Sequence, residues 1–212
     1  MMKGIWFGDI HSHEDLNLLL SNVDIPPATP KTNYVDIPGG DGSVDLTEAL
    51  GGVKYEDRKC TFTFSVFPTD DFEEKKREIS NLLNGKRFKI VVDKDPDYYW
   101  LGRCAINTYE SNKNVHKIAV GAVVAPYKLK HDETTVVVEA GESVKGRLWN
   151  SRKSVVPTIT CEANATITHD GVEYELSAGT HKILNINLVE GYNELLVTSN
   201  GTVTFTYQEG DL

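Results

Sequence analysis

The sequence lacks several features that would assign it to a class at once. It contains no run of about 18 apolar residues, which excludes a transmembrane helix, and its first residues include no apolar stretch of the kind that a secretion signal needs. The cysteines Cys60, Cys104 and Cys161 are widely spaced and form no Cys-x-x-Cys pair, so we expect small buried thiols. We expect a protein that is made in the cytoplasm and does not insert into membranes.

Positive charge is scarce as well. The chain has 22 basic and 31 acidic side chains, which give a formal net charge of −9. The acidic excess is present in both halves of the sequence, so the average hides no basic tail. Proteins that wrap nucleic acid neutralise its phosphates with lysine and arginine. We therefore expect no specific binding of nucleic acid.

Motifs for catalysis and cofactor binding are also missing. There is no Gly-x-Ser-x-Gly elbow, P-loop or dinucleotide fingerprint, so we expect no enzyme, no catalytic residue and no cofactor. His11 and His13 could ligate a metal if they lay on a strand, but a polar turn is the simpler interpretation. The alternating acids of residues 93–97 resemble a calcium loop, yet Pro96 and the missing closing glutamate favour a hairpin turn.

Two-residue periodicity is what the sequence has in abundance. Residues 61–67 alternate polar and apolar side chains, which is typical of a half-buried strand. Short strand-like segments follow to the C-terminus, one of them over residues 179–188, and Asp170-Gly171 predicts a tight hairpin. Short strands at intervals of about 8 to 12 residues predict a mainly β protein built as a sandwich or barrel.

One helix is predicted, over about residues 70–84. Thr69 or Asp70 can cap its start, and Asp70 has capping-box spacing to Glu73. Gly85 is suited to end the helix. The helix has an apolar stripe, formed by Phe72, Ile79, Leu82 and Leu83.

The order of predicted elements changes once along the chain. Strands and the helix precede a proline-containing segment near residues 125–128, and only strands follow it. We therefore predict two domains, residues 1–126 and 127–212, and the absence of a low-complexity linker predicts that they touch.

Aromatic residues could form a binding platform. Flat rings stack on the apolar faces of sugars, so Tyr98, Trp100 and Trp149 are candidates for contact with a glycan or another subunit. Strand alternation places Tyr98 and Trp100 on one face and Tyr99 on the other, and a core or subunit contact is favoured over a glycan.

One block, residues 34–64, has an order of residues that is more specific than its amino-acid composition alone. Its distinctive residues are Pro38, Gly39, Gly40, Asp41, Gly42, Asp45, Leu46, Tyr55 and Arg58. The block closely resembles the N-terminal domain of the distal tail proteins (Dit) of siphovirus-type phages of Gram-positive hosts, which share a Pro-Gly-x-(Asp/Asn)-Gly turn, an Asp-Leu-Thr segment and a Tyr-x-(Asp/Asn)-Arg strand start. The resemblance covers residues 5–126 and includes residues 6–12, 82–86 and 99–103. We interpret the block as structural, with Arg58 able to pair across strands or subunits.

The resemblance implies both an architecture and a role. Members of this family combine a barrel-like N-terminal domain with a galectin-like β-sandwich. They form a ring, usually a homo-hexamer, that joins the tail tube protein to the tail tip or hub protein in the virion. Receptor-binding proteins attach to the outer domain of some members. A carbohydrate-binding module or adhesin is the alternative, and an enzyme ranks third.

Overall fold

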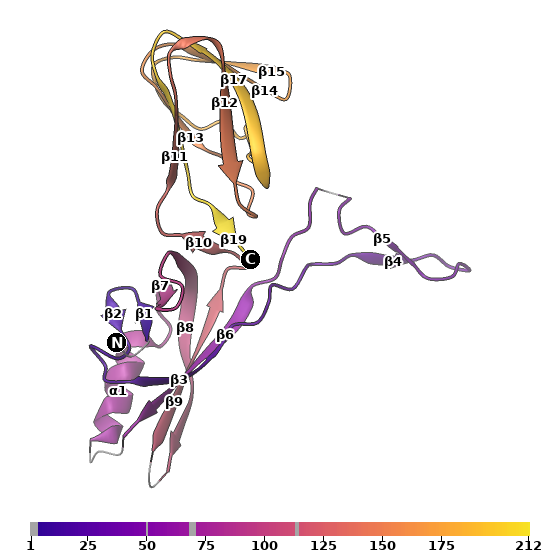
Figure 1. Cartoon of the computed structure of the whole chain (residues 1–212). Coiled ribbons are helices and arrows are strands. Elements are labelled where there is room, and N and C mark those ends of the chain that lie inside the picture. Colours follow the sequence, from indigo (N-terminus) through magenta and orange to yellow (C-terminus); the bar gives the residue numbers. More distant parts are fainter. Residues whose placement is uncertain (1–3, 50, 68–70, 113–114) are drawn as a thin grey trace. The chain divides into compact units, whose positions relative to one another are not determined.

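The computed structural model describes residues 4–49, 51–67, 71–112 and 115–212 (Figure 1). The chain divides into two compact units, Met1–Lys128 and Leu129–Leu212, and the division falls inside β10 (Lys128–Lys130). Each unit has its own hydrophobic core. In the described part of the chain, no helix has the length and apolar character needed to cross a bilayer.

An antiparallel sheet forms the first unit. Along its main path the strands are β2 (Ile10–His11), β1 (Ile5–Phe7), β7 (Arg87–Val92), β8 (Tyr98–Ser111), β9 (His116–Val124), β6 (Arg58–Val66) and β3 (Leu19–Asp24). The resemblance implied a barrel-like domain; among the described strands this path is open, with β2 and β3 at its ends. The predicted strand over residues 61–67 is confirmed as part of β6, whose alternate residues are buried.

The helix α1 (Phe72–Leu83) packs on one face of this sheet. Phe72, Ile79 and Leu83 join the core of the unit, as the apolar stripe predicts. The helix begins at Phe72, with Asp71 in the N-cap position and without a side-chain capping hydrogen bond. Thr69 and Asp70, the predicted capping residues, lie outside the described residues. Gly85 follows the helix with a positive φ of 75°.

A β-sandwich forms the second unit. One sheet has the order β11 (Thr134–Val138), β18 (Val203–Tyr207), β13 (Thr158–Cys161) and β16 (Gly179–His181); the other has the order β12 (Gly141–Asn150), β17 (Gly191–Ser199), β14 (Ala165–His169) and β15 (Val172–Leu176). The short strand β19 (Gly210–Asp211) ends the chain. Phe205 and Ile159 of the first sheet share a core with Leu148 and Val197 of the second.

Two local predictions in this unit have different outcomes. The Asp170-Gly171 hairpin between β14 and β15 is confirmed, and both residues have positive φ. The prediction of one strand over residues 179–188 is wrong beyond His181, where β16 ends. A loop carries Ile186 and Leu188 into the core, which explains why both residues are apolar although they are not in a strand. The backbone of Leu188 forms hydrogen bonds with that of Val155.

All three cysteines are buried and unpaired, which confirms the expectation from their neighbours. Burial raises the pKa of the Cys60 thiol to about 11 and that of Cys104 to about 12. Burial also raises the pKa of Cys161. The thiols therefore act as small apolar side chains.

Glu209 is a buried carboxylate at the end of the second unit. Ser151 Oγ donates to it over 2.6 Å, Thr134 Oγ1 also donates, and Lys130 Nζ lies 3.3 Å away. Burial favours a raised pKa, but these hydrogen bonds and the lysine charge outweigh it and hold the pKa of Glu209 below its ordinary value.

We expect Glu209→Gln to lower the free energy of unfolding of the second unit by about 2 kcal/mol at pH 7. A carboxylate with a lowered folded pKa stabilises the fold above its unfolded pKa of 4.5, and this contribution is lost as pH falls through the folded pKa. Urea unfolding at pH 7 and at pH 3 should therefore show a difference between wild type and variant that shrinks in acid.

The matched control for this prediction is Glu190→Gln. Glu190 pairs with Arg152 on the surface, where ion pairs contribute about 0 to 1 kcal/mol. Equal losses for the two variants would contradict the assigned role of Glu209.

Candidate functional site

One of the two histidine candidates for a metal site, His11, forms a structural contact. His11 is buried, with Nε2 3.2 Å from Asp93 Oδ2 and with Nδ1 3.2 Å from the backbone nitrogen of Glu14. Asp93 also accepts a hydrogen bond from the Gly4 nitrogen over 2.6 Å. His13 does not join this contact, and the described residues contain no group of three or more possible metal ligands. The contact holds the β1–β2 hairpin to the loop that follows β7.

The acids of residues 93–97 lie in that loop, which connects β7 to β8. The Asp95 nitrogen donates to the Val92 carbonyl over 2.8 Å, and the Asp95 carboxylate pairs with Lys128 Nζ at 2.7 Å. The segment is therefore the hairpin turn that the sequence favours.

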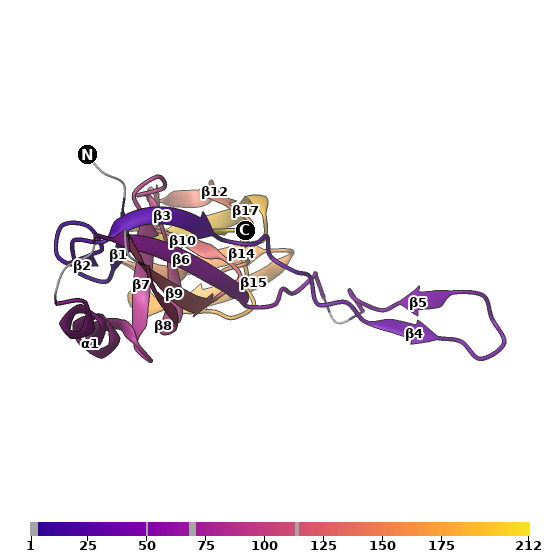
Figure 2. The ribbon, with the colours of Figure 1, turned by 90° about the horizontal axis from the view of Figure 1, so that it is seen from below.

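The main candidate for a functional surface is a projecting arm, which we define as residues 25–57. It leaves the sheet after β3 and returns to it at β6, and its outer part is a hairpin of β4 (Tyr34–Asp36) and β5 (Ser43–Asp45) (Figures 1 and 2). Backbone hydrogen bonds tie its two sides together from Thr29–Glu56 outwards. Within the described part of the first unit, the arm extends from the sheet and no second layer packs against β4 and β5 (Figure 2).

The distinctive residues of the sequence block build this arm. Pro38 to Gly42 form its tip, where Gly39 and Gly42 have φ of 80° and 74°. A Cβ at either glycine would meet no atom within 4 Å, so the glycines serve the backbone conformation. Hydrogen bonds from the Thr47 side chain and from the Thr47 nitrogen, which donates to Asp45 Oδ1, lower the pKa of Asp45.

The remaining residues of the block lie nearer the sheet. Leu46 follows β5 and is exposed. The Tyr55 ring meets the Tyr127 ring edge to face, with centroids 5.9 Å apart. Arg58 starts β6, where burial lowers its pKa and Nη1 donates to the Pro26 carbonyl over 3.4 Å. Arg58 thus braces the base of the arm.

The two faces of the arm differ in chemistry. Register places Val35 opposite Val44, and strand alternation adds Ile37 and Leu46 to this aliphatic face. All four side chains are exposed; Ile37 retains 54% of its accessible surface. The other face carries Tyr34, Asp36, Ser43 and Asp45. Within residues 34–48 there are four acids and no basic residue: Asp36, Asp41, Asp45 and Glu48.

A second feature lies on the sheet of the same unit, and we call it the basic groove. It has a volume of about 520 Å³ and is lined by Arg87, Leu101, Arg103, Val123 and Ala125, among other residues of β7, β8 and β9 and the segments beside them. Lys59 is paired in register with Val123, one of the lining residues, and so lies next to the groove. The sequence did not indicate the groove, because strand pairing alone brings these residues together.

The aromatic candidates are in different environments. Trp100 is 7% exposed and packs in the core of the first unit, while Tyr98 lies under the Lys128 ammonium group. Trp149 is 49% exposed on β12 and meets Tyr192 of β17 with ring centroids 4.9 Å apart. Arg147 stacks on the same Tyr192 ring at 3.7 Å.

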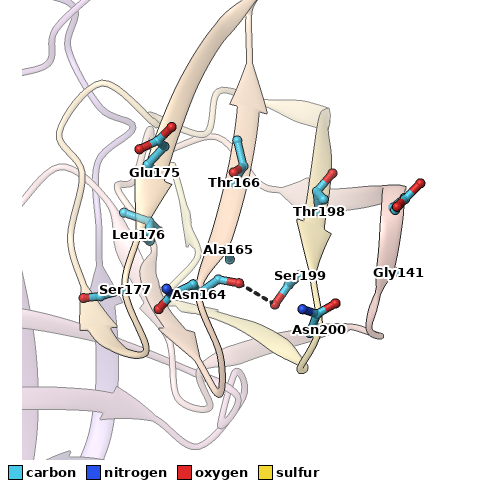
Figure 3. A pocket seen from close by; sticks show the side chains of 11 residues that line it. Gly141, Asn164, Ala165, Thr166, Glu175, Leu176, Ser177, Thr198, Ser199 and Asn200 are labelled. Atoms are coloured by element: carbon cyan, nitrogen blue, oxygen red, sulfur yellow. Dashed lines mark hydrogen bonds between the residues drawn. The ribbon is translucent and has the colours of Figure 1, made fainter.

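A polar hollow of about 500 Å³ occupies the opposite end of the same sheet (Figure 3). Its lining includes Asn164, Thr166, Glu175 and Thr198, so it offers hydroxyl, amide and carboxylate groups. No histidine, cysteine or lysine is among the described residues that line it.

Comparison with known proteins matches this architecture to one family. A family model for the RIFT-related domain of phage tail proteins matches residues 12–122, so the chain belongs to this family of phage tail proteins. The crystal structure of SPP1 Dit, described as a paradigm of the hub adsorption apparatus in phages that infect Gram-positive bacteria, has the same fold. The two chains are 18% identical, the match covers 100% of each, and the TM-score is 0.73.

Other comparisons add little. A de novo designed double-stranded β-helix covers 38% of this chain and 99% of its own, with 17% identity and a TM-score of 0.26. No curated protein matches the sequence.

Proposed function

We propose that the protein is a distal tail protein whose copies form a ring, a homo-hexamer, between the tail tube and the tip of the phage tail. Its membership of the tail protein family and its full-length likeness to the fold of SPP1 Dit support this role. The observation that carries the proposal is the projecting arm.

The exposed surface of the arm indicates that it binds a partner. A two-stranded hairpin is marginally stable in water when nothing covers it. Here Val35, Ile37 and Val44 are exposed along one face. An arm that reaches from one copy to a different surface of the next makes a heterologous contact, and such contacts form a ring when the rotation between copies closes.

The two domains take different parts in this proposal. Residues 1–126 form the ring, and residues 127–212, with a galectin-like sandwich, lie outside it. The tail tube protein binds one side of the ring, the tail tip or hub protein binds the other, and a receptor-binding protein can attach to the outer domain. Six copies carry a net charge of about −54, which suits a ring that DNA crosses without adhering.

The test is the oligomeric state of the full chain. Light scattering coupled to gel filtration should give the mass of six copies, and negative-stain microscopy should show rings. A chain that remains a single copy at the highest attainable concentration, and forms no ring with tail tube protein added, would overturn the proposal.

One observation favours a second candidate, a carbohydrate-binding module. Trp149, Tyr192 and Arg147 form an exposed cluster on the outer face of β12 and β17. An indole beside a guanidinium can stack on a sugar ring and donate to its hydroxyls. A glycan array should then give hits that Trp149→Ala removes and that the exposed control Leu184→Ala retains. An array without hits would dispose of this candidate.

A further inference from the structure

The basic groove departs from the acidic character of the whole chain. Cross-strand register places Lys59, Val123, Arg103 and Arg87 in one row over β6, β9, β8 and β7. Alternation along each strand puts all four side chains on the same exposed face. Three positive charges thus lie on neighbouring strands of a protein whose net charge is −9.

This row is unfavourable in an isolated copy. Arg87 and Arg103 are directly opposite each other, and like charges in this position destabilise a sheet. In the described part of the chain, neither arginine nor Lys59 forms an ion pair. Arg103 donates to the Gly85 carbonyl, which leaves its charge uncompensated.

The groove also has an apolar floor, which distinguishes it from a simple anion site. Leu101, Ala105, Val123 and Ala125 line it together with the two arginines. Asp57 also lines the groove and repels any anionic group placed beside it, a phosphate or a carboxylate alike. A polypeptide that combines acids with apolar or aromatic side chains fits this surface better than nucleic acid does.

We propose that the basic groove of one copy binds the arm of a neighbouring copy, with Asp36 and Asp45 of the arm against Arg87 and Arg103. These two acids lie on the same face of the arm as Tyr34, whose ring can stack on a guanidinium. The inference rests on the proposed ring and specifies which surface receives the arm. The aliphatic face of the arm takes no part in this contact and is available for a second one.

Charge reversal tests the pairing directly. We expect the arm variant Asp36→Lys/Asp45→Lys and the groove variant Arg87→Glu/Arg103→Glu each to assemble about 100-fold less well than wild type, because like charges then meet in every contact. The equimolar mixture should assemble again, because the reversed arm of one copy fits the reversed groove of the other and the two alternate around an even-numbered ring. The mass is measured by light scattering over a concentration series.

Controls separate folding from assembly. Glu173→Lys/Glu175→Lys reverses two exposed charges on β15 and should leave assembly unchanged. Circular dichroism melting curves should be alike for all variants, since the reversed side chains are exposed. If a variant melts at the wild-type temperature but forms no ring, the loss of the ring is due to the altered contact and not to unfolding.

The outcomes distinguish the two proposals. A wild-type chain that forms no ring counts against the proposed function. A wild-type ring that persists in the groove variant overturns the groove inference and leaves the ring standing. Two monomeric variants whose mixture stays monomeric also overturn it, because the two surfaces then do not pair. Binding of DNA by wild type that Arg87→Glu/Arg103→Glu abolishes, with the ring intact, would assign the groove to nucleic acid and overturn the inference.

Discussion

Replacing residues 31–54 by a two-residue Gly-Ser turn is expected to convert the proposed ring into a folded single copy, so that the particle mass falls from that of six copies to that of one. The backbone permits the replacement, because Pro30 and Tyr55, the residues that the turn would connect, already form an antiparallel β-bridge. None of the described residues that the variant removes, 31–49 and 51–54, belongs to the core of the unit. Deletion should therefore change the free energy of unfolding by no more than about 0.5 kcal/mol, the range of surface changes.

Light scattering measures the mass, and circular dichroism checks the fold of the shortened chain. A milder variant, Val44→Ser, keeps the arm and removes part of its aliphatic face, and it should weaken assembly without abolishing it. Val137→Ser, which alters an exposed valine of the second unit, is the matched control and should assemble normally. A ring that survives removal of the arm would refute the role assigned to it.

The substitution Gly102→Ala is expected to destabilise the first unit by about 3 kcal/mol, at the upper end of the usual cost of overpacking. A Cβ on Gly102 would lie 2.6 Å from the carbonyl oxygen of Val123 and 2.5 Å from Val124 Cγ1. Both atoms belong to β9, which lies between β8 and β6 in the sheet. A central strand is held on two sides, so its backbone cannot move aside at low cost.

Gly52→Ala is the control for this experiment, because a Cβ there meets no atom within 4 Å. Hydrogen exchange resolved by peptide should be faster in β8 and β9 of the Gly102 variant and unchanged in β17 and β18 of the second unit. Equal exchange in the two alanine variants would show that β9 accommodates the methyl group, contrary to the geometry.

The elements that the sequence predicted depend on local chemistry. The alternation in residues 61–67 and the Asp170-Gly171 turn each specify their own structure within a few residues, and both are confirmed. The strand β1 was not predicted, because three residues carry too short a pattern. Its structure is decided by pairing with β7, where Ile5 lies opposite Val92.

The projecting arm could not be predicted from the sequence motif that it contains. Residues 34–64 identified the family from their glycines and acids, yet the pattern did not indicate a hairpin that projects from the sheet. Alternation within β4 and β5 covers only three residues each, and no core contact marks them. The direction of the arm depends on where β3 ends and β6 begins, which is a property of the sheet.

The sequence by itself determined the mainly β class, the helix, the tail protein resemblance and the net charge of −9. Only the tertiary structure decided where positive charge gathers within that acidic total. Lys59, Arg87 and Arg103 are distant in sequence and become neighbours through the register of four strands. Turn and strand preferences act between adjacent residues and can be read along the chain, whereas register joins residues that only the completed sheet brings together.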